Sequence, residues 1–190
     1  MEEIFLTLIN GAQLILRDDD MLTSWPAFLA FCEQHRISVL DLPTAFWHEW
    51  VFAIEHQTAL PPDCIRTVII GGEAALPAQV MLWRRRVTGS IRLINTYGPT
   101  ETTVVSTSAD LAGPDTHANT DTVTIGTPLS GVACLILDAD LLPVPHGEPG
   151  ELCILGPTLA QGYWQDSALT AQRFVTLQHW PGKTRVYRSG

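Results

Sequence analysis

The chain has 190 residues, of which 46% are hydrophobic and 16% are charged, and its net charge is −9. This composition is that of a globular protein long enough to bury a substantial core. The negative charge argues against nucleic acid or an anionic membrane as partner, because both reward a basic protein surface. No apolar run approaches the roughly 20 residues that span a bilayer. The acidic start Met1-Glu2-Glu3 differs from a secretory signal, so we expect a cytoplasmic protein.

Helical patterns and short β-rich runs alternate in the first half of the chain. The sequence Ser24-Trp25-Pro26 predicts the start of a helix, with Ser24 as the N-cap and proline in the first turn. We expect this helix to run to about His35 and a strand to follow at 37–40. Pro43 then opens a second helix, whose apolar residues recur at helical spacing.

The next stretch predicts a strand, a helix and a second strand. Residues 66–70 form a continuous β-branched run that ends in Gly71-Gly72, which is typical of a buried parallel strand entering a tight turn. Residues 77–87 suit a helix and 91–94 suit the following strand. This βαβ order predicts an α/β fold with a mostly parallel sheet. Ligands bind such sheets beyond the carboxyl ends of the strands.

The character of the chain changes after about residue 110. Residues 112–121 are polar and contain Gly and Pro, which predicts a surface loop. Short β runs follow at 132–137 and 151–155, and 166–174 suit a short helix. We therefore expect an α/β part over residues 1–110 and a smaller β-rich part over residues 111–190.

The sharpest motif is Asn95-Thr96-Tyr97-Gly98-Pro99-Thr100-Glu101-Thr102-Thr103. Its Gly-Pro pair makes a defined turn, and the hydroxyl residues after it offer donors to phosphate oxygens. A carboxylate such as Glu101 suits Mg²⁺, which bridges phosphates, and Tyr97 offers a ring that can stack on a base. The residue types alone leave a purely structural interpretation open, because hydroxyl residues are also common in turns and strands.

This segment resembles the core signature of adenylate-forming (AMP-binding) enzymes, in the NxYGPTE form that is usual in the adenylation domains of nonribosomal peptide synthetases. Further segments agree with that family in order and spacing, so the resemblance covers nearly the whole chain. They are Glu2–Phe5 with Leu8–Ala12, Gly71–Leu76, Gly150–Gly156 with Gly162–Trp164, and Tyr187–Gly190. The resemblance implies an internal part of an adenylation domain, with a mostly parallel βαβ layer followed by a smaller β-rich subdomain.

The resemblance implies a reaction that joins an amino acid to AMP from ATP, with loss of pyrophosphate. Thr100 and Glu101 are the expected catalytic residues: Thr100 contacts the α-phosphate, and Glu101 binds Mg²⁺. The nucleotide-binding residues implied for ATP or AMP are Gly72, Glu73 and Ala74 at the adenine edge, Asn95 at the adenine amino group, Tyr97 stacked on adenine, and Gly98 and Thr100 in the turn.

The same resemblance implies partners in the full-length enzyme, namely a peptidyl carrier domain bearing phosphopantetheine and a condensation domain. Several family segments are not within residues 1–190, including the phosphate loop, the ribose-binding aspartate and the domain with the catalytic lysine. We therefore expect the isolated chain to be catalytically incomplete. Gln161 stands where the family usually has arginine, and Ser189 where it has threonine.

Alignment to the family's substrate pocket implies a lining of Glu2, Asp41, Ile69, Gly71, Thr96, Val104 and Val105. Two acids stand among small or apolar residues, and a buried carboxylate is costly unless it is paired. A substrate cation would supply the partner, so we expect a basic amino acid, lysine or ornithine before arginine. The alternative is structural: Glu2 points to solvent, and Asp41 bonds backbone amides ahead of Pro43.

Two other functions compete with this one. An acyl- or aryl-CoA ligase would share the fold, although the NxYGPTE form favours amino-acid activation. A non-catalytic remnant would keep nucleotide contacts and lose turnover. A dinucleotide-binding module has little support, because no GxGxxG follows a predicted strand.

Overall fold

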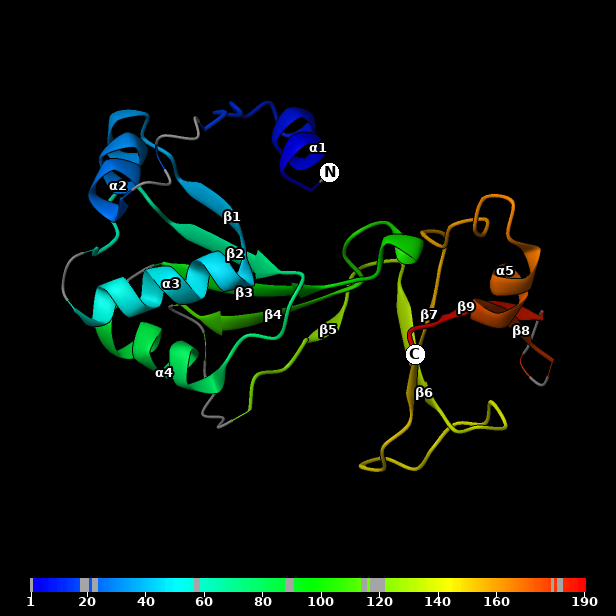
Figure 1. Cartoon of the computed structure of the whole chain (residues 1–190). Helices are drawn as coiled ribbons and strands as arrows, with labels where there is room; N and C mark the ends of the chain where they lie inside the picture. The colour runs from blue at the N-terminus through cyan, green and yellow to red at the C-terminus, as the bar shows by residue number, and fades with distance from the viewer. Residues whose placement is uncertain are drawn as a thin grey trace. The chain divides into compact units, whose positions relative to one another are not determined.

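The computed structural model describes residues 2–17, 21, 24–56, 59–87, 91–113, 116, 122–178, 180 and 183–190. The chain forms two compact units (Figure 1). The first comprises Met1–Thr96 and Ser108–Gly126, and the second comprises Tyr97–Thr107 and Thr127–Gly190. The division into parts 1–110 and 111–190 expected from the sequence stays a prediction.

A sheet whose strands follow in chain order organises the first unit. Its main strands are β1 (Val39–Pro43), β2 (Thr67–Gly71), β3 (Arg92–Tyr97) and β4 (Thr107–Ala112). The two-residue strand β5 (Thr127–Pro128) belongs to the residues of the second unit. The predicted parallel arrangement is confirmed for β1, β2 and β3. β1 runs two residues later than expected and continues to Pro43, because its pairing with β2 extends to the Pro43–Gly71 register position.

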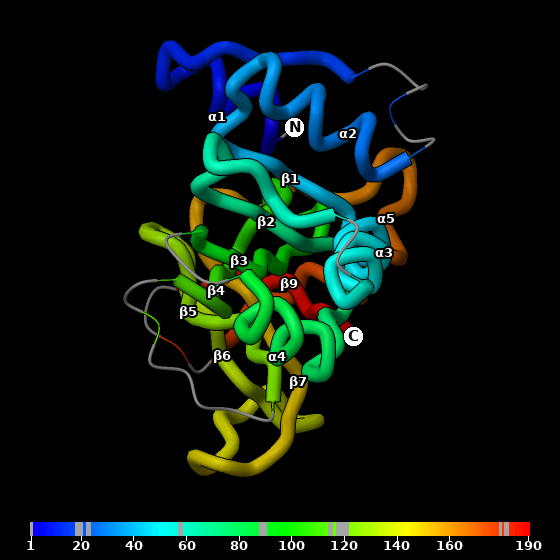
Figure 2. Tube along the Cα trace, turned by 90° about the vertical axis from the view of Figure 1, so that its left-hand side faces the viewer, coloured from blue at the N-terminus to red at the C-terminus, as the bar shows by residue number. Residues whose placement is uncertain are grey.

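Three helices pack over one face of this sheet: α2 (Trp25–Gln34), α3 (Thr44–Glu55) and α4 (Pro77–Arg86). Side chains alternate along the strands, so Leu40, Val68 and Leu93 are buried while their neighbours are more exposed. Figures 1 and 2 show α3 and α4 side by side. Three fully buried tryptophans fill this layer of helices, namely Trp47, Trp50 and Trp83. Each such aromatic buries about 150–250 Å², so this face carries most of the unit's apolar stabilisation.

Local signals explain where these helices begin. The Ser24 hydroxyl accepts a hydrogen bond from the Ala27 amide at 3.3 Å, which confirms the predicted N-cap of α2.

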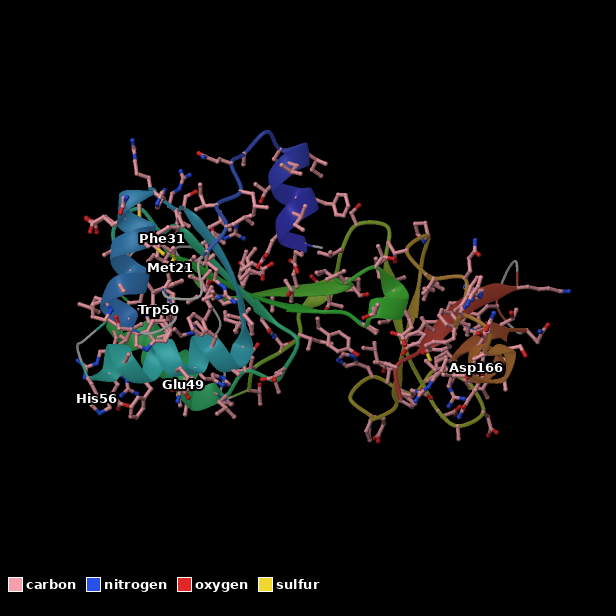
Figure 3. All side chains as sticks on the ribbon, turned by 45° about the horizontal axis from the view of Figure 1, so that its top comes forward. Met21, Phe31, Glu49, Trp50, His56 and Asp166 are labelled. Carbon is pink, nitrogen blue, oxygen red and sulfur yellow. The ribbon has the colours of Figure 1, made fainter. Side chains whose placement is uncertain are left out.

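Trp50, labelled in Figure 3, donates its indole N–H to the Ala59 carbonyl at 2.8 Å. That bond ties α3 to the segment that leads into β2.

The first helix, α1 (Glu2–Ile9), was not predicted and has no buried residue. Its side chains Ile4, Phe5, Leu6, Leu8 and Ile9 are exposed. None of the described helices is long and apolar enough to cross a bilayer.

An antiparallel sheet organises the second unit. Its strands lie in the order β6 (Ala133–Leu137), β7 (Glu151–Leu155), β9 (Thr184–Arg188) and β8 (Phe174–Leu177). The helix α5 (Ser167–Arg173) precedes β8, and the Asp166 carboxylate, labelled in Figure 3, caps it by accepting from the Leu169 amide at 2.8 Å. The small core is Leu137, Cys153, Leu177 and Val186. The predicted β-rich character of this region is confirmed, and the predicted loop at 112–121 lies largely outside the described residues.

Candidate functional site

The turn over residues 98–106, called the motif turn below, follows directly on the end of β3 and contains Gly98-Pro99-Thr100-Glu101 of the sequence motif. Gly98 comes after Tyr97, and the 3-10 helix η2 (Thr100–Thr102) begins two residues later. A Cβ atom at Gly98 would lie 2.3 Å from the Val104 carbonyl oxygen and 2.7 Å from the Ser106 amide nitrogen. No side chain fits there, so glycine lets the two arms of the turn approach each other.

Hydrogen bonds close this turn on itself. The Ser106 amide donates to the Tyr97 carbonyl at 2.8 Å, and the buried Thr102 and Ser106 hydroxyls lie 2.7 Å apart. Thr103 and Val104 both have left-handed backbone, with φ of 67° and 56°. Such a conformation is unfavourable for a β-branched residue, and strained backbone concentrates at functional sites.

The Glu101 side chain is hydrogen-bonded by Tyr163, a residue of the same unit that is far away in sequence. The Tyr163 hydroxyl donates a short hydrogen bond to Glu101 Oε1, and the Ala160 amide donates to the Glu101 carbonyl at 2.7 Å. The Tyr163 hydrogen bond holds the pKa of Glu101 below its usual value, against a smaller opposing effect of burial. Glu101 is therefore an ionised carboxylate at neutral pH.

The donor set of this turn fits Mg²⁺. Magnesium prefers oxygen ligands and commonly takes one or two carboxylates, with phosphate oxygens and water completing its shell. Glu101 supplies one ionised carboxylate, and exposed Thr100 precedes it. No cluster of three or more acidic, histidine or cysteine side chains occurs in the described part of the chain, so a cation here would need ligands from phosphates.

The predicted adenine-side residues Gly72, Glu73 and Ala74 are exposed in the first unit, after the end of β2. The buried Thr44 hydroxyl lies 3.1 Å from the Gly71 carbonyl oxygen and 3.3 Å from the Glu73 carbonyl oxygen. Thr44, at the start of α3, thus fixes the path of this loop. Residues 72–74 remain exposed, so a ligand could reach them.

Asn95 lies on β3 with 5% of its surface exposed. Its amide nitrogen donates to the Thr124 carbonyl at 3.0 Å. An interaction with the adenine amino group would therefore have to use the amide oxygen of Asn95, which is the correct partner for an N–H donor.

Four of the predicted substrate-pocket residues share one face of the first sheet. Asp41 pairs in register with Ile69, and Gly71 pairs with Thr96. All four are half-buried and alternate with the buried residues that face the helices. They therefore lie on the sheet face turned away from the core.

Burial, with a smaller contribution from the nearby charges of Glu2 and Glu3, raises the pKa of Asp41 to about 6. Burial also raises the pKa of Glu2. The two acids of the predicted pocket are thus close enough to interact. Val104 and Val105, the other two predicted residues, belong to the motif turn in the second unit.

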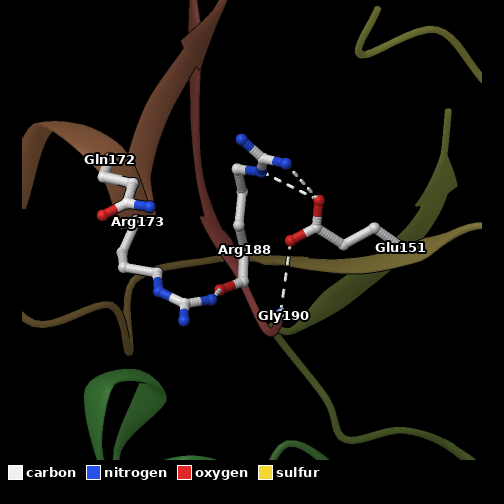
Figure 4. A pocket seen from close by; sticks show the side chains of 5 residues that line it. All are labelled: Glu151, Gln172, Arg173, Arg188 and Gly190. Atoms are coloured by element: carbon white, nitrogen blue, oxygen red, sulfur yellow. Dashed lines mark hydrogen bonds and ion pairs between the residues drawn. The ribbon is translucent and has the colours of Figure 1, made fainter. Parts of the chain in front are cut away.

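A cavity of about 260 Å³ lies in the second unit, lined by Glu151, Gln172, Arg173, Arg188 and Gly190 (Figure 4). Arg188 donates from Nε at 2.9 Å and from Nη2 at 2.5 Å to Glu151 Oε2, and the Gly190 amide donates to Oε1. These bonds join Gly150–Gly156 to Tyr187–Gly190, two of the segments that carry the family resemblance. The cavity contains none of the predicted nucleotide or pocket residues.

The hydrogen bond from Tyr163 to Glu101 was not predicted from the sequence. The only available signal was the Gly162-Tyr163-Trp164 motif, and nothing in its spacing shows which residue it contacts 62 positions away.

Residues 1–164 match the protein family described as AMP-binding enzyme. Isonitrile lipopeptide synthase from Streptomyces coeruleorubidus is 48% identical over the whole chain, which spans 12% of that protein. Gramicidin S synthase 1 from Brevibacillus brevis is 35% identical over 99% of the chain, which spans 16% of that protein. The chain thus covers a small part of the curated relatives that it matches.

Solved structures with a similar fold also come from an adenylation enzyme. The N-terminal subdomain of NpsA from Klebsiella oxytoca, in complex with 3-hydroxyanthranilyl-AMSN, aligns with 98% of the chain and 44% of its own length, at a TM-score of 0.74 and 26% identity. An artificial fusion of the same enzyme, the adenylation–PCP di-domain NpsA-ThdA, aligns at a TM-score of 0.75. The mixed fold expected from the sequence is confirmed.

Proposed function

The chain belongs to the AMP-binding enzyme family, and from this premise we propose that it is part of an adenylation domain that activates an amino acid as its aminoacyl-AMP for nonribosomal peptide synthesis. The observation that carries the proposal is the motif turn, where an ionised Glu101 carboxylate follows an exposed Thr100 directly after β3. Turns beyond the carboxyl ends of strands are where α/β sheets bind nucleotides.

Each motif residue has a role in this activity. Tyr97 stacks on adenine, the Asn95 amide oxygen accepts from the adenine amino group, and the Gly72-Glu73-Ala74 loop lines the adenine edge. Thr100 donates to the α-phosphate. Glu101 would hold Mg²⁺, which neutralises charge that gathers on the phosphates when it is bound.

We propose a basic amino acid, lysine or ornithine, as the substrate. Burial raises the pKa of both Asp41 and Glu2, and the Glu2 charge adds to the rise at Asp41, so a cation beside Asp41 would be stabilising. A substrate ammonium near Asp41 would relieve that repulsion and keep both carboxylates ionised. The half-buried neighbours Ile69 and Thr96 would contact the aliphatic part of the side chain.

The product would pass to a peptidyl carrier domain that bears phosphopantetheine, next to a condensation domain. The adenylation–PCP fusion of the similar enzyme NpsA supports the first of these partners. Because the chain aligns with only 44% of the NpsA subdomain, we infer that residues 1–190 alone do not catalyse formation of the aminoacyl-AMP.

The test is amino-acid-dependent exchange of pyrophosphate into ATP, in a complete adenylation domain that carries residues 1–190. We expect exchange with lysine or ornithine, and Asp41→Asn should lower kcat/KM for them at least tenfold with less effect on neutral amino acids. Exposed Asp63→Asn is the matched control. Exchange that prefers a neutral amino acid would refute the substrate assignment. Carboxylate-dependent exchange that ignores amino acids would point to a CoA ligase, and ATP binding without exchange would point to a non-catalytic remnant.

A further inference from the structure

The carboxylate assigned to Mg²⁺ is contacted by a residue outside the nucleotide motif. Tyr163 donates its hydroxyl proton to Glu101 Oε1 across 62 positions of sequence. A carboxylate has two oxygens and about four lone-pair positions, so this bond leaves Glu101 able to ligate a cation. One hydrogen bond also removes the free rotation that an exposed glutamate would otherwise have.

Tyr163 is itself held in place. Its backbone amide donates to the Thr170 hydroxyl of α5 at 2.9 Å. Its ring lies edge-on to Phe174, with centroids 5.8 Å apart, and Phe174 in turn packs against Tyr187 at 5.2 Å. The phenol therefore comes from an anchored aromatic cluster and not from a free loop.

The segment before Tyr163 is tied to the motif turn at two further points. The Ala160 amide donates to the Glu101 carbonyl at 2.7 Å, and the Thr103 hydroxyl donates to the Thr158 carbonyl at 2.8 Å. Segment 158–163 thus runs along the turn and contacts both the backbone and the side chain of Glu101.

Arg185 of β9 also binds the backbone of this segment. Its Nη1 donates to the Ala160 carbonyl and its Nη2 donates to the Gln161 carbonyl, each at 2.7 Å. The guanidinium also lies 4.4 Å from the centroid of the Phe174 ring. A planar guanidinium suits such a two-point contact, which a lysine ammonium cannot reproduce.

We propose that Tyr163 is a positioning residue of the metal site, whose hydroxyl orients the Glu101 carboxylate for Mg²⁺ bound with ATP, and that Arg185 supports it by fixing segment 158–163. This inference rests on the proposed function, because it takes Glu101 as the metal ligand. Carboxylates that bind metals are generally held by hydrogen bonds, and removing such a partner typically weakens metal affinity by roughly 10–100-fold.

The test uses a complete adenylation domain that carries residues 1–190, with Mn²⁺ as an electron-paramagnetic probe and a non-hydrolysable ATP analogue. Tyr163→Phe keeps the ring against Phe174 and removes only the hydroxyl. We expect it to weaken Mn²⁺ binding to the analogue complex about tenfold, while binding of the analogue without metal stays within twofold. Trp164→Phe, at a neighbouring side chain that is 89% exposed, is the matched control and should change neither value.

Two further variants separate the possible results. Arg185→Lys should weaken Mn²⁺ binding less than Tyr163→Phe, since the hydroxyl remains, and Glu101→Gln should weaken it most. If Glu101→Gln weakens Mn²⁺ binding and Tyr163→Phe only lowers Tm, then Tyr163 is merely structural and the inference fails while the proposed function stands. If Glu101→Gln itself leaves Mn²⁺ binding unchanged, the metal assignment in the proposed function fails.

Discussion

Asp41 of β1 lies opposite Ile69 of β2 in parallel register, on the sheet face turned away from α2, α3 and α4. A carboxylate in this position is partly desolvated and has acidic neighbours, and the pKa of Asp41 is accordingly raised to about 6. An acid in such surroundings is costly for folding, and residues kept at such a cost commonly serve binding.

The first prediction concerns Asp41 and pH. A pKa raised from 3.8 to about 6 means that the folded chain binds more protons than the unfolded chain between these values. Stability therefore falls as pH rises through this window, and the full penalty is present above about pH 6. Asp41→Asn removes the penalty. We expect the variant to be more stable by about 1 kcal/mol at pH 7, after allowing for solvent screening of a partly exposed group, and this difference should become much smaller as the pH is lowered to 4.

Urea unfolding of the chain at pH 4, 5, 6 and 7 measures this difference, with Asp63→Asn as the exposed control. An Asp41→Asn variant that is less stable than the parent at pH 7 would mean that the carboxylate makes a stabilising bond, as the structural alternative for Asp41 holds.

A second prediction concerns Gly98. Its missing Cβ would meet the Val104 carbonyl oxygen at 2.3 Å, and that oxygen is backbone and cannot rotate away. We expect Gly98→Ala to destabilise the second unit by about 2–4 kcal/mol, as overpacking and lost turn geometry do. Gly147→Ala is the control for an added methyl in open space, since nothing lies within 4 Å of it, although its φ of 92° adds backbone strain. Thermal unfolding followed by circular dichroism gives both values, and equal losses in the two variants would contradict the steric argument.

The sequence predicted the first unit better than the second for a physical reason. The β-branched run before Gly71, the N-cap Ser24 and Pro43 at the start of α3 act locally, so their elements are visible in a single stretch of sequence. β4 of the first unit was nevertheless missed. β8 and β9 were missed because they are short and are stabilised by pairing with each other and, for β9, with β7. Sheet pairing depends on partners that local patterns do not reveal.

In the candidate site, too, residue types were predictable from sequence and long-range contacts were not. The roles of the motif residues Asn95, Tyr97 and Glu101 were predicted from sequence and stay predictions, since the types and order of these residues are themselves the signal. The contact from Tyr163 to Glu101 and the two carbonyls held by Arg185 follow from tertiary packing. Asn95 shows the limit of residue type alone, because its buried amide nitrogen is already bonded to Thr124.

A third prediction concerns the strained turn. Val104 has a φ of 56°, where a β-branched side chain crowds the following carbonyl, while asparagine tolerates this conformation. We expect Val104→Asn to stabilise the chain by about 1 kcal/mol. Val105→Asn makes the same chemical change at a neighbour without left-handed backbone and should not stabilise. Urea unfolding at pH 7 compares the two, and the idea of stored strain fails if both variants lose stability alike.

The last prediction concerns the ion pair between Glu151 of β7 and Arg188 of β9. Their side chains are 18% and 33% exposed, and Arg188 donates twice to one carboxylate oxygen. The Arg188 hydrogen bond holds the pKa of Glu151 below its ordinary value of 4.5. A lowered pKa means that the pair stabilises the fold above that ordinary value, and that the benefit is lost as pH falls through the lower folded pKa.

Glu151→Gln should therefore cost roughly 1–3 kcal/mol at pH 7, as hydrogen bonds to charged groups do, and the difference from the parent should shrink as the pH is lowered below 4.5. The Arg92–Asp110 pair of the first unit supplies the control, because its side chains are 53% and 48% exposed and Asp110→Asn should cost under about 1 kcal/mol. Urea unfolding of both variants at pH 3 and pH 7 measures the two losses. A Glu151→Gln penalty that is the same at both pH values would show that the loss comes from packing and not from the charge.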